Sequence, residues 1–225
     1  MKLNVNYFDN YIGIIDNNIT TVEIVNKKYF YRFIKDLMEI ENGIPSEDII
    51  FSNDNEIINL SGKINVITNF FEFNFDSKKY NNILVKYLSN SINDSGKDNI
   101  IKNLKNLNLS IKKELNKFDL PLSINTEENF ENIIKNFKIV INNFNNDLLG
   151  NLLLIIDIEK IFKINKIIIL VNLKQLLSND ELIELYKYAI YNGIRLIMID
   201  SAYYKNKLNY ENKLIINDDL TEFIV

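Results

Sequence analysis

Two continuous apolar runs joined by a helix with clear ends constrain the fold of this chain more than any other feature. The runs 167–171 and 194–199 have no polar alternation, which is typical of parallel strands that are covered on both faces. Between them, Ser178 and Glu181 have the spacing of a capping box, and Gly193 stands where a helix-ending residue belongs. The segment therefore predicts a right-handed βαβ unit and an α/β fold.

Polar residues follow both predicted strands, Asn172 and Asp200, at the edge where open α/β sheets usually bind ligands. None of the six glycines are spaced as in the phosphate-binding motifs G-x-x-x-x-G-K-[ST] and G-x-G-x-x-G. The pair Gly62-Lys63 lacks the upstream glycine and the following Ser or Thr, so we expect a turn there. We therefore predict no nucleotide binding, and we expect Asp200 to be a capping or turn residue.

Composition excludes several kinds of chemistry. The 225 residues contain neither cysteine nor histidine, so there is no thiolate nucleophile, no cysteine zinc site and no imidazole base. Any metal must be bound by carboxylate and carbonyl oxygens, which favours calcium or magnesium. These absences favour a protein that is not an enzyme.

The N-terminal segment MKLNVNYFDN has no apolar signal region, and no run of about twenty uncharged apolar residues is available to span a membrane. We therefore expect a cytoplasmic protein without a membrane partner. The formal net charge is −4, so a role with nucleic acid must depend on local clusters of basic residues.

The periodicity changes along the chain and predicts two domains. A hairpin is expected from 2–8 and 11–15, a further strand at 20–25, and a helix from the capping residue Asn26 to Gly43, with Met38 on its inner side. From residue 76 the pattern is helical, with helices at 77–91 and 97–117 and a third capped by Asn125 and Glu128. We therefore predict an α/β head domain, residues 1–71 and 146–225, interrupted by an α-helical leg domain, residues 72–145.

The predicted helix 97–117 has an apolar stripe and a basic face. At 100° per residue the stripe falls within a narrow arc and is expected to be buried, with the lysines on the opposite side. Such lysines are suited to contacting phosphates without reading sequence, although the sequence alone favours an ordinary solvated helix face. The stripe consists of Ile100, Leu104, Leu107, Ile111, Leu115 and Phe118, and the candidate DNA-binding residues are Lys102, Lys105, Lys112 and Lys113.

Two further pairs of lysines begin predicted helices and are secondary candidates for DNA binding. They are Lys27-Lys28 and Lys78-Lys79. Because lysine in the first turn opposes the helix dipole, helix stability alone does not favour it there.

Acidic residues gather around the connector that contains Pro121. Asp119, Glu127 and Glu128 could supply oxygen ligands to a divalent ion, although their spacing matches no EF-hand loop. Helix capping explains Glu127 and Glu128 equally well.

The segment 148–162 is apolar almost throughout, and as a helix it has more apolar surface than one sheet face can cover. We therefore expect part of it to form a subunit contact.

The order of these elements resembles the ring-forming spacer-acquisition protein of type II-A CRISPR systems, the Csn-two family. Three segments carry the resemblance, and the third is the most specific because it has the pattern lysine, apolar strand, Val-Asn, loop, helix and second apolar strand. They are MKLNVNYFDNYIGI, KFDLPLSIN leading into NFENIIKNFKIVI, and NKIIILVNLKQLLSNDELIELYKYAIYNGIRLIMIDS.

The resemblance implies a head with a degenerate P-loop-ATPase-like sheet that binds no nucleotide, and a tetrameric ring that binds ends of double-stranded DNA through lysines. It also implies calcium, and as partners the CRISPR integrase complex and the RNA-guided nuclease of this antiviral defence. The connector of the family is acidic, whereas this one keeps a single acid, Asp119, which moves any calcium site onto Asp119, Glu127 and Glu128. Two alternatives remain open: a structural adaptor that binds protein partners, and a degenerate P-loop nucleotide-binding protein.

Overall fold

The chain forms two compact units, residues 1–73 with 144–225 and residues 74–143. The computed structural model describes residues 1–54, 56–73, 75, 78–124, 129–137, 139–142, 147–164 and 167–225. Each unit has its own core and is described separately below.

The larger unit is built on a six-stranded sheet in which every neighbouring pair is parallel except the pair at one edge. The order is β10-β9-β3-β8-β7-β6, and only β10 and β9 are antiparallel. The predicted α/β class with a parallel sheet is therefore confirmed, in a mixed form. The strands are β3 (Ile19–Ile24), β6 (Ile64–Ile67), β7 (Ile167–Val171), β8 (Arg195–Asp200), β9 (Glu211–Ile216) and β10 (Glu222–Ile224).

A second, antiparallel sheet of four strands, in the order β2-β1-β4-β5, contains the predicted N-terminal hairpin. The hairpin turn reaches the C-terminal strand of the large sheet. The backbone N–H groups of Asp9 and Asn10 each donate to the carboxylate of Glu222 over 2.7 Å. The strands are β1 (Lys2–Val5), β2 (Ile12–Gly13), β4 (Ile49–Asn53) and β5 (Glu56–Ile58), of which β5 was not predicted.

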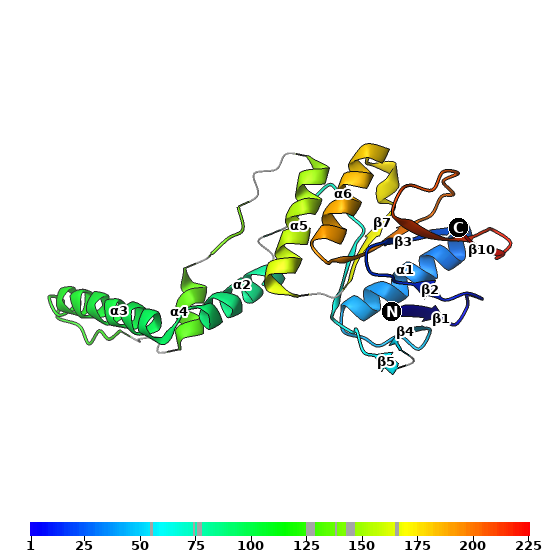
Figure 1. The fold of residues 1–225 in the computed structure, drawn as a ribbon. Helices are drawn as coiled ribbons and strands as arrows, with labels where there is room; N and C mark the ends of the chain where they lie inside the picture. Colours follow the sequence, from blue (N-terminus) through cyan, green and yellow to red (C-terminus); the bar gives the residue numbers. More distant parts are fainter. Residues whose placement is uncertain are drawn as a thin grey trace. The chain divides into compact units, whose positions relative to one another are not determined.

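Helix α1 (Lys27–Glu41) packs between the two sheets and closes the main apolar core (Figure 1). Its N-cap is Asn26, as predicted, since the Asn26 side chain accepts from the backbone N–H of Lys28 and Tyr29. The prediction that Met38 points inward is wrong: 41% of its surface is exposed, and Ile40 is buried instead.

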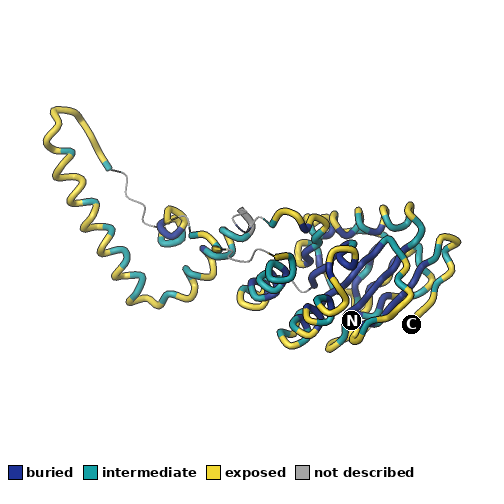
Figure 2. Tube along the Cα trace, turned by 90° about the horizontal axis from the view of Figure 1, so that it is seen from above, coloured by how far each residue is buried: buried dark blue, intermediate teal, exposed yellow. Residues whose placement is uncertain are grey.

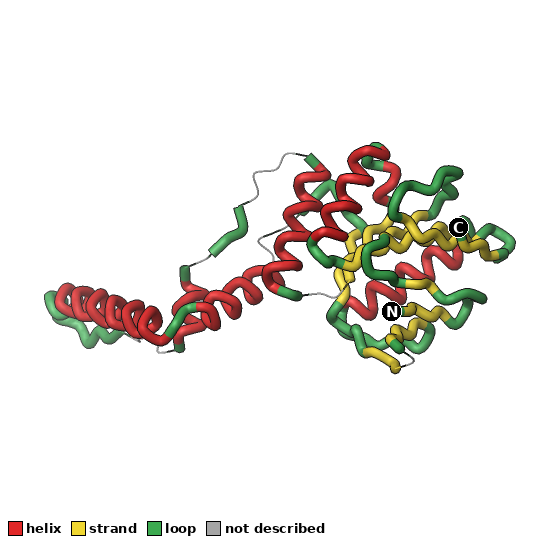
Figure 3. The backbone as a smooth tube through the Cα atoms, viewed as in Figure 1, coloured by secondary structure: helices red, strands yellow, loops and turns green. Residues whose placement is uncertain are grey.

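Helices α5 (Leu148–Phe162) and α6 (Asn179–Tyr191) lie together against the opposite face of the large sheet (Figure 3). The predicted capping box of Ser178 and Glu181 is present. Most of the apolar surface of α5 is covered, and among its large apolar residues only Ile161 is more than half exposed. Whether the remaining surface of α5 forms a subunit contact stays a prediction.

On the same face, a buried cluster of acids and lysines lies beneath the loop 201–210. The Lys174 Nζ, from the short 3-10 helix η1 (Leu173–Gln175), lies 2.8 Å from a Glu211 carboxylate oxygen and 3.3 Å from one of Glu23. The Lys213 Nζ lies 2.8 Å from the same Glu23 oxygen. All four side chains are at most 3% exposed. The cluster therefore joins β3, β9 and η1 through ion pairs that water does not screen.

The cluster also holds the loop in place. Glu23 accepts from the backbone N–H of Tyr204, Glu211 accepts from that of Leu208, and the Lys213 ammonium donates to the carbonyl of Tyr204. The phenol of Tyr186 on α6 donates to Glu211 over 2.9 Å. A helix in the place of this loop would pair its backbone groups internally. In the loop, the backbone groups of Tyr204 and Leu208 pair with buried side chains instead.

The smaller unit is helical and has a small core. It contains α2 (Lys78–Ser91), α3 (Asp94–Leu115) and α4 (Phe130–Asn136), with Val85, Ile133 and Ile134 buried. Helix α3 begins at Asp94, after its N-cap Asn93, three residues earlier than predicted. The side chain of Asn129 caps α4, and the predicted capping residues Asn125 and Glu128 lie outside the described residues.

None of the 22 residues of α3 is buried (Figure 2). The predicted burial of its apolar stripe is therefore wrong. Leu107 is 56% exposed, Ile111 43% and Phe118, which follows the helix, 60%. Because most helical stability in proteins comes from packing of an apolar face, a helix of this kind needs a contact that the smaller unit does not itself provide.

Replacing Lys174 by Met should strongly destabilise the larger unit. The substitution leaves Glu23 and Glu211 buried with one cation fewer, and removal of one partner from a buried pair costs about 3–5 kcal/mol. Urea denaturation followed by far-ultraviolet circular dichroism measures the change. The matched control is K187M on the exposed side of α6, which should change stability by less than about 0.5 kcal/mol. Equal stability of K174M and K187M would mean that the cluster contributes nothing.

Candidate nucleic-acid interface

The candidate lysines Lys102, Lys105, Lys112 and Lys113 are all exposed on α3. None of them forms an ion pair with another residue in the part of the chain that the structure describes. Other lysines of this segment are engaged, since Lys117 pairs with Glu114 over 2.6 Å and the Lys97 ammonium lies 5.9 Å from the ring centroid of Phe130. The four candidates therefore retain their full charge for an external anion.

The lysines are not all opposite the apolar stripe, as the sequence had suggested. At 100° per residue, Lys102 and Lys113 are roughly opposite it, whereas Lys105 lies only about 120° and Lys112 about 100° from its centre. The structure places these two lysines on a groove whose lining includes Leu104. The basic face is therefore broader than predicted and borders apolar surface on one side.

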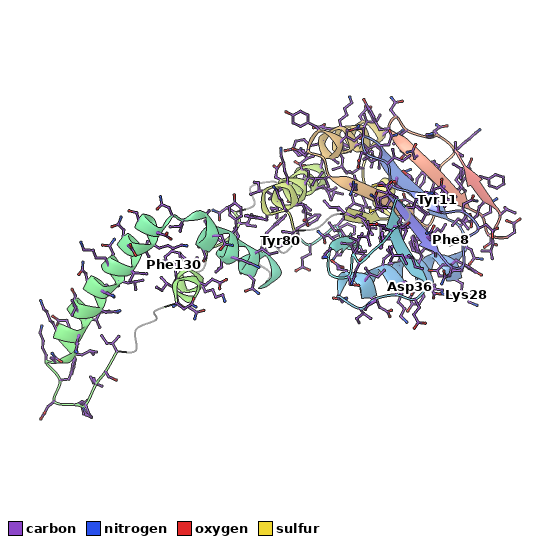
Figure 4. The ribbon with its side chains drawn as sticks, turned by 60° about the horizontal axis from the view of Figure 1, so that its bottom comes forward. Phe8, Tyr11, Lys28, Asp36, Tyr80 and Phe130 are labelled. Atoms are coloured by element: carbon purple, nitrogen blue, oxygen red, sulfur yellow. The ribbon has the colours of Figure 1, made fainter. Side chains whose placement is uncertain are left out.

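The secondary candidates belong to other helices. Lys27 and Lys28 are exposed in the first turn of α1, which contains no acidic residue, and the Lys28 side chain lies at the surface of the larger unit (Figure 4). Lys78 and Lys79 begin α2, but their side chains lie outside the described residues. The structure thus brings four candidates together on α3, whereas Lys27 and Lys28 belong to α1 of the larger unit.

The acidic candidates for calcium do not form a described site. Asp119 is exposed, whereas Glu127 and Glu128 lie outside the described residues. Across those parts of the chain whose structure is described, no group of three or more acidic side chains is close enough to hold a metal ion. The described donors do not fit a calcium site, and calcium binding stays a prediction.

Two strand-to-helix connections of the large sheet, β3 to α1 and β7 to α6, do not form a phosphate loop. Only Val25 and Asn26 separate β3 from α1, whereas the phosphate-binding motif is eight residues long. The connection from β7 to α6, residues 172–178, contains no glycine, and its Lys174 is turned into the buried cluster. Asn172, at the end of β7, accepts from the backbone N–H and the hydroxyl of Ser201.

Asp200 is neither a capping nor a turn residue, contrary to expectation. It is fully buried at the end of β8, and neither carboxylate oxygen has a hydrogen-bond partner among the described residues. Burial raises the pKa of Asp200 to about 7; the nearby Lys174 opposes this shift and Glu23 adds to it. With Asp200 neutral, the cluster contains two acids and two lysines and is electrically balanced.

The stability of the protein should therefore fall as pH rises from about 4 to 7. The folded state holds the Asp200 proton up to about pH 7, whereas the unfolded chain releases it near the ordinary value of 3.8. The shift corresponds to about 4 kcal/mol at full ionisation. Urea midpoints of the parent and of D200N between pH 4.5 and 8 test this, because D200N should lack this component of the pH dependence.

D180N on the exposed start of α6 is the control and should retain the pH dependence of the parent. If D200N and the parent respond to pH in the same way, Asp200 is not protonated in the folded protein at neutral pH.

The four residues of the buried cluster were not identified from the sequence. Glu23 and Lys213 each interrupt an otherwise buried strand, and that interruption is a signal that could have been used. Glu211 lies among polar residues, and Lys174 lies in a mixed polar and apolar connection, so neither has such a signal.

The structure thus defines a two-unit α/β protein with an exposed basic helix. Residues 43–220 match the family model described as CRISPR-associated protein (Cas_Csn2), which is more than half of the 225 residues. The chain therefore belongs to the Cas_Csn2 family, and this membership implies a role in CRISPR adaptation.

Among solved structures, the fold is similar to Stu0660 of Streptococcus thermophilus, with a TM-score of 0.58 and 13% identity. The similarity covers 96% of this chain and 75% of that chain, and at this identity it supports the fold alone. No curated protein sequence matches the chain significantly. In the described parts of the chain, no helix has both the length and the apolar character needed to cross a membrane.

Proposed function

We propose that this protein acts in CRISPR spacer acquisition as a non-catalytic protein that binds ends of linear double-stranded DNA. The observation that carries the proposal is the basic face of α3, where four exposed lysines have no ion-pair partner among the described residues. Lysines spaced along a helix contact phosphates rather than bases, so the binding does not depend on DNA sequence. Membership of the Cas_Csn2 family supports this reading.

The working form is a ring of four copies, with the DNA end entering its hole. Support comes from the exposed apolar stripe on α3, which lies roughly opposite Lys102 and Lys113 around the helix and needs a cover. A second copy that covers the stripe leaves Lys102 and Lys113 free for DNA. In this reading residues 1–71 and 146–225 are the head and residues 72–145 the leg.

The head is a degenerate relative of P-loop ATPases that binds no nucleotide. The two-residue connection from β3 to α1 and the lack of a glycine cradle support this. The partners are the integrase complex and the RNA-guided nuclease of the CRISPR machinery. Calcium remains part of the proposal only with Asp119, Glu127 and Glu128 as its ligands.

Replacing Lys102, Lys105, Lys112 and Lys113 together by Ala should weaken binding of linear duplex far more than any single replacement. Each lysine–phosphate interaction that is removed should reduce the slope of log affinity against log salt by about 0.9, so the slope should fall by up to about 3.6 for each bound copy. Fluorescence anisotropy over a salt series, with duplexes of unrelated sequence, measures both effects. Covalently closed circles should compete poorly with linear fragments because a ring needs a free end.

A variant with four exposed lysines outside α3 replaced by Ala has the same net charge and is the control. Its positions are Lys35, Lys63, Lys187 and Lys205. If both quadruple variants bind duplex with equally reduced affinity, the effect is one of net charge and α3 is not the DNA surface.

Replacing Leu107 and Ile111 together by Gln should reduce the size of the assembly. Both side chains are about half exposed in the single chain, so the change removes apolar contact area between copies and leaves the fold of one copy intact. Sedimentation velocity at micromolar concentration should show a tetramer for the parent and smaller species for the variant. Y191Q, at an 85% exposed position on α6, should remain tetrameric. A monomeric parent would exclude the ring.

A further inference from the structure

A groove of about 770 Å³ runs along α3 in the smaller unit. Leu104, Leu109 and Leu115 form its wall on α3, and Leu122 and Ile124 face them from the segment after the helix. Ile133 of α4 contributes to the lining. The volume is far larger than one side chain needs, and the exposed fractions of Leu109 (59%) and Leu122 (47%) show that the groove is open.

The basic residues on this groove are Lys105 and Lys112. They are seven residues apart on α3, which places them two turns apart, about 10 Å, on the same side of the helix. Both are exposed, and neither pairs with an acid among the described residues. Of the described residues that line the groove, none is acidic. The groove therefore combines apolar walls with an uncompensated positive charge.

We propose that this groove binds an amphipathic helix of a partner protein, with acidic residues along the edges of its apolar face. The lining on α3 extends from Ile101 to Leu115, about 21 Å, which accommodates about four turns of a second helix. Apolar side chains at i, i+3, i+4 and i+7 of that helix fill the groove, as in other helix-in-groove complexes. Its carboxylates pair with Lys105 and Lys112.

The charge of the groove distinguishes this partner from the two obvious alternatives. Duplex DNA supplies phosphates for the lysines but no apolar surface for Leu109 and Leu122. Helix α3 of a second copy is itself basic, so its lysines repel Lys105 and Lys112. An acidic amphipathic helix satisfies both the walls and the lysines.

The inference does not depend on DNA binding. Lys102 and Lys113 do not line the groove, so DNA and peptide binding can be separated by mutation. If the protein binds both DNA and the partner helix, the two ligands compete for Lys105 and Lys112.

The probe is a fluorescently labelled synthetic 18-residue peptide with leucines at i, i+3, i+4 and i+7 and glutamates on the flanking positions, titrated into the full chain. Saturable binding in the micromolar range is expected from its anisotropy. Two peptides serve as controls: a scrambled one without an apolar face, and one with lysine in place of every glutamate. Each should bind at least tenfold more weakly. Absence of saturable binding, or equal binding of the scrambled peptide, overturns the proposal.

Two double variants locate the site. L109S/L122S removes apolar wall area at exposed positions, and K105E/K112E reverses the charge; each should reduce peptide affinity at least tenfold with an unchanged circular dichroism spectrum. K102E/K113E makes the same charge change outside the groove and should leave peptide affinity unchanged while weakening DNA binding.

The outcomes of the two proposals can be told apart. If K102E/K113E weakens the peptide as much as K105E/K112E does, the binding is non-specific attraction and the groove proposal fails. If L109S/L122S changes the sedimentation of the protein, the groove is occupied by a second copy of the chain and not by a partner helix, so the groove proposal fails. If the groove variants weaken peptide binding but the parent protein binds no duplex, the groove proposal is supported and only the DNA proposal is rejected.

Discussion

The ion pairs between Glu23, Lys174, Glu211 and Lys213 are the interaction on which the larger unit depends. In a parallel sheet, successive strands are usually joined by helices that cover a face, but β8 and β9 are joined by the loop 201–210. A loop over a buried face leaves backbone donors and acceptors that need partners. The cluster supplies them, and its charges are balanced when Asp200 is neutral.

Such a cluster does not have to add stability over an apolar core, because removing charges from water is costly. The cluster instead fixes the relative positions of η1, β9 and the loop, because the two carboxylates find all their partners in only one arrangement of these segments. The cluster therefore fixes the turn after β7, the place where a nucleotide-binding relative needs free polar groups. This is a physical reason, beyond the missing glycines, why we infer that the sheet does not bind nucleotide.

The smaller unit depends on contacts of another kind. Its core is small, and α3 presents apolar and basic side chains around most of its circumference without burying any of them. The apolar stripe, the groove and the basic face overlap on this helix. Leu104 and Leu115 belong to both the stripe and the groove, and Lys105 and Lys112 belong to both the groove and the basic face. The proposed contacts with a second copy, a protein partner and DNA therefore use overlapping parts of one element.

Local sequence patterns were sufficient to predict the elements that depend only on residues close together in the chain. The Ser178–Glu181 capping box, the Asn26 cap, the N-terminal hairpin and the apolar runs of β7 and β8 were predicted correctly, because each rests on residues close together in the chain. The candidate lysines were likewise recognised as a basic face, since their spacing on a helix is a property of the helix alone.

Only the tertiary structure decided what covers each surface. Sequence periodicity shows that a stripe is apolar but does not show whether anything packs against it. The exposed stripe of α3 was therefore predicted in the opposite sense. Asp200 was misjudged for the same reason: its environment comes from Glu23, Lys174 and Glu211, which are distant in the chain. Burial and charge pairing are sums over such distant neighbours, and the pattern of one segment does not contain them.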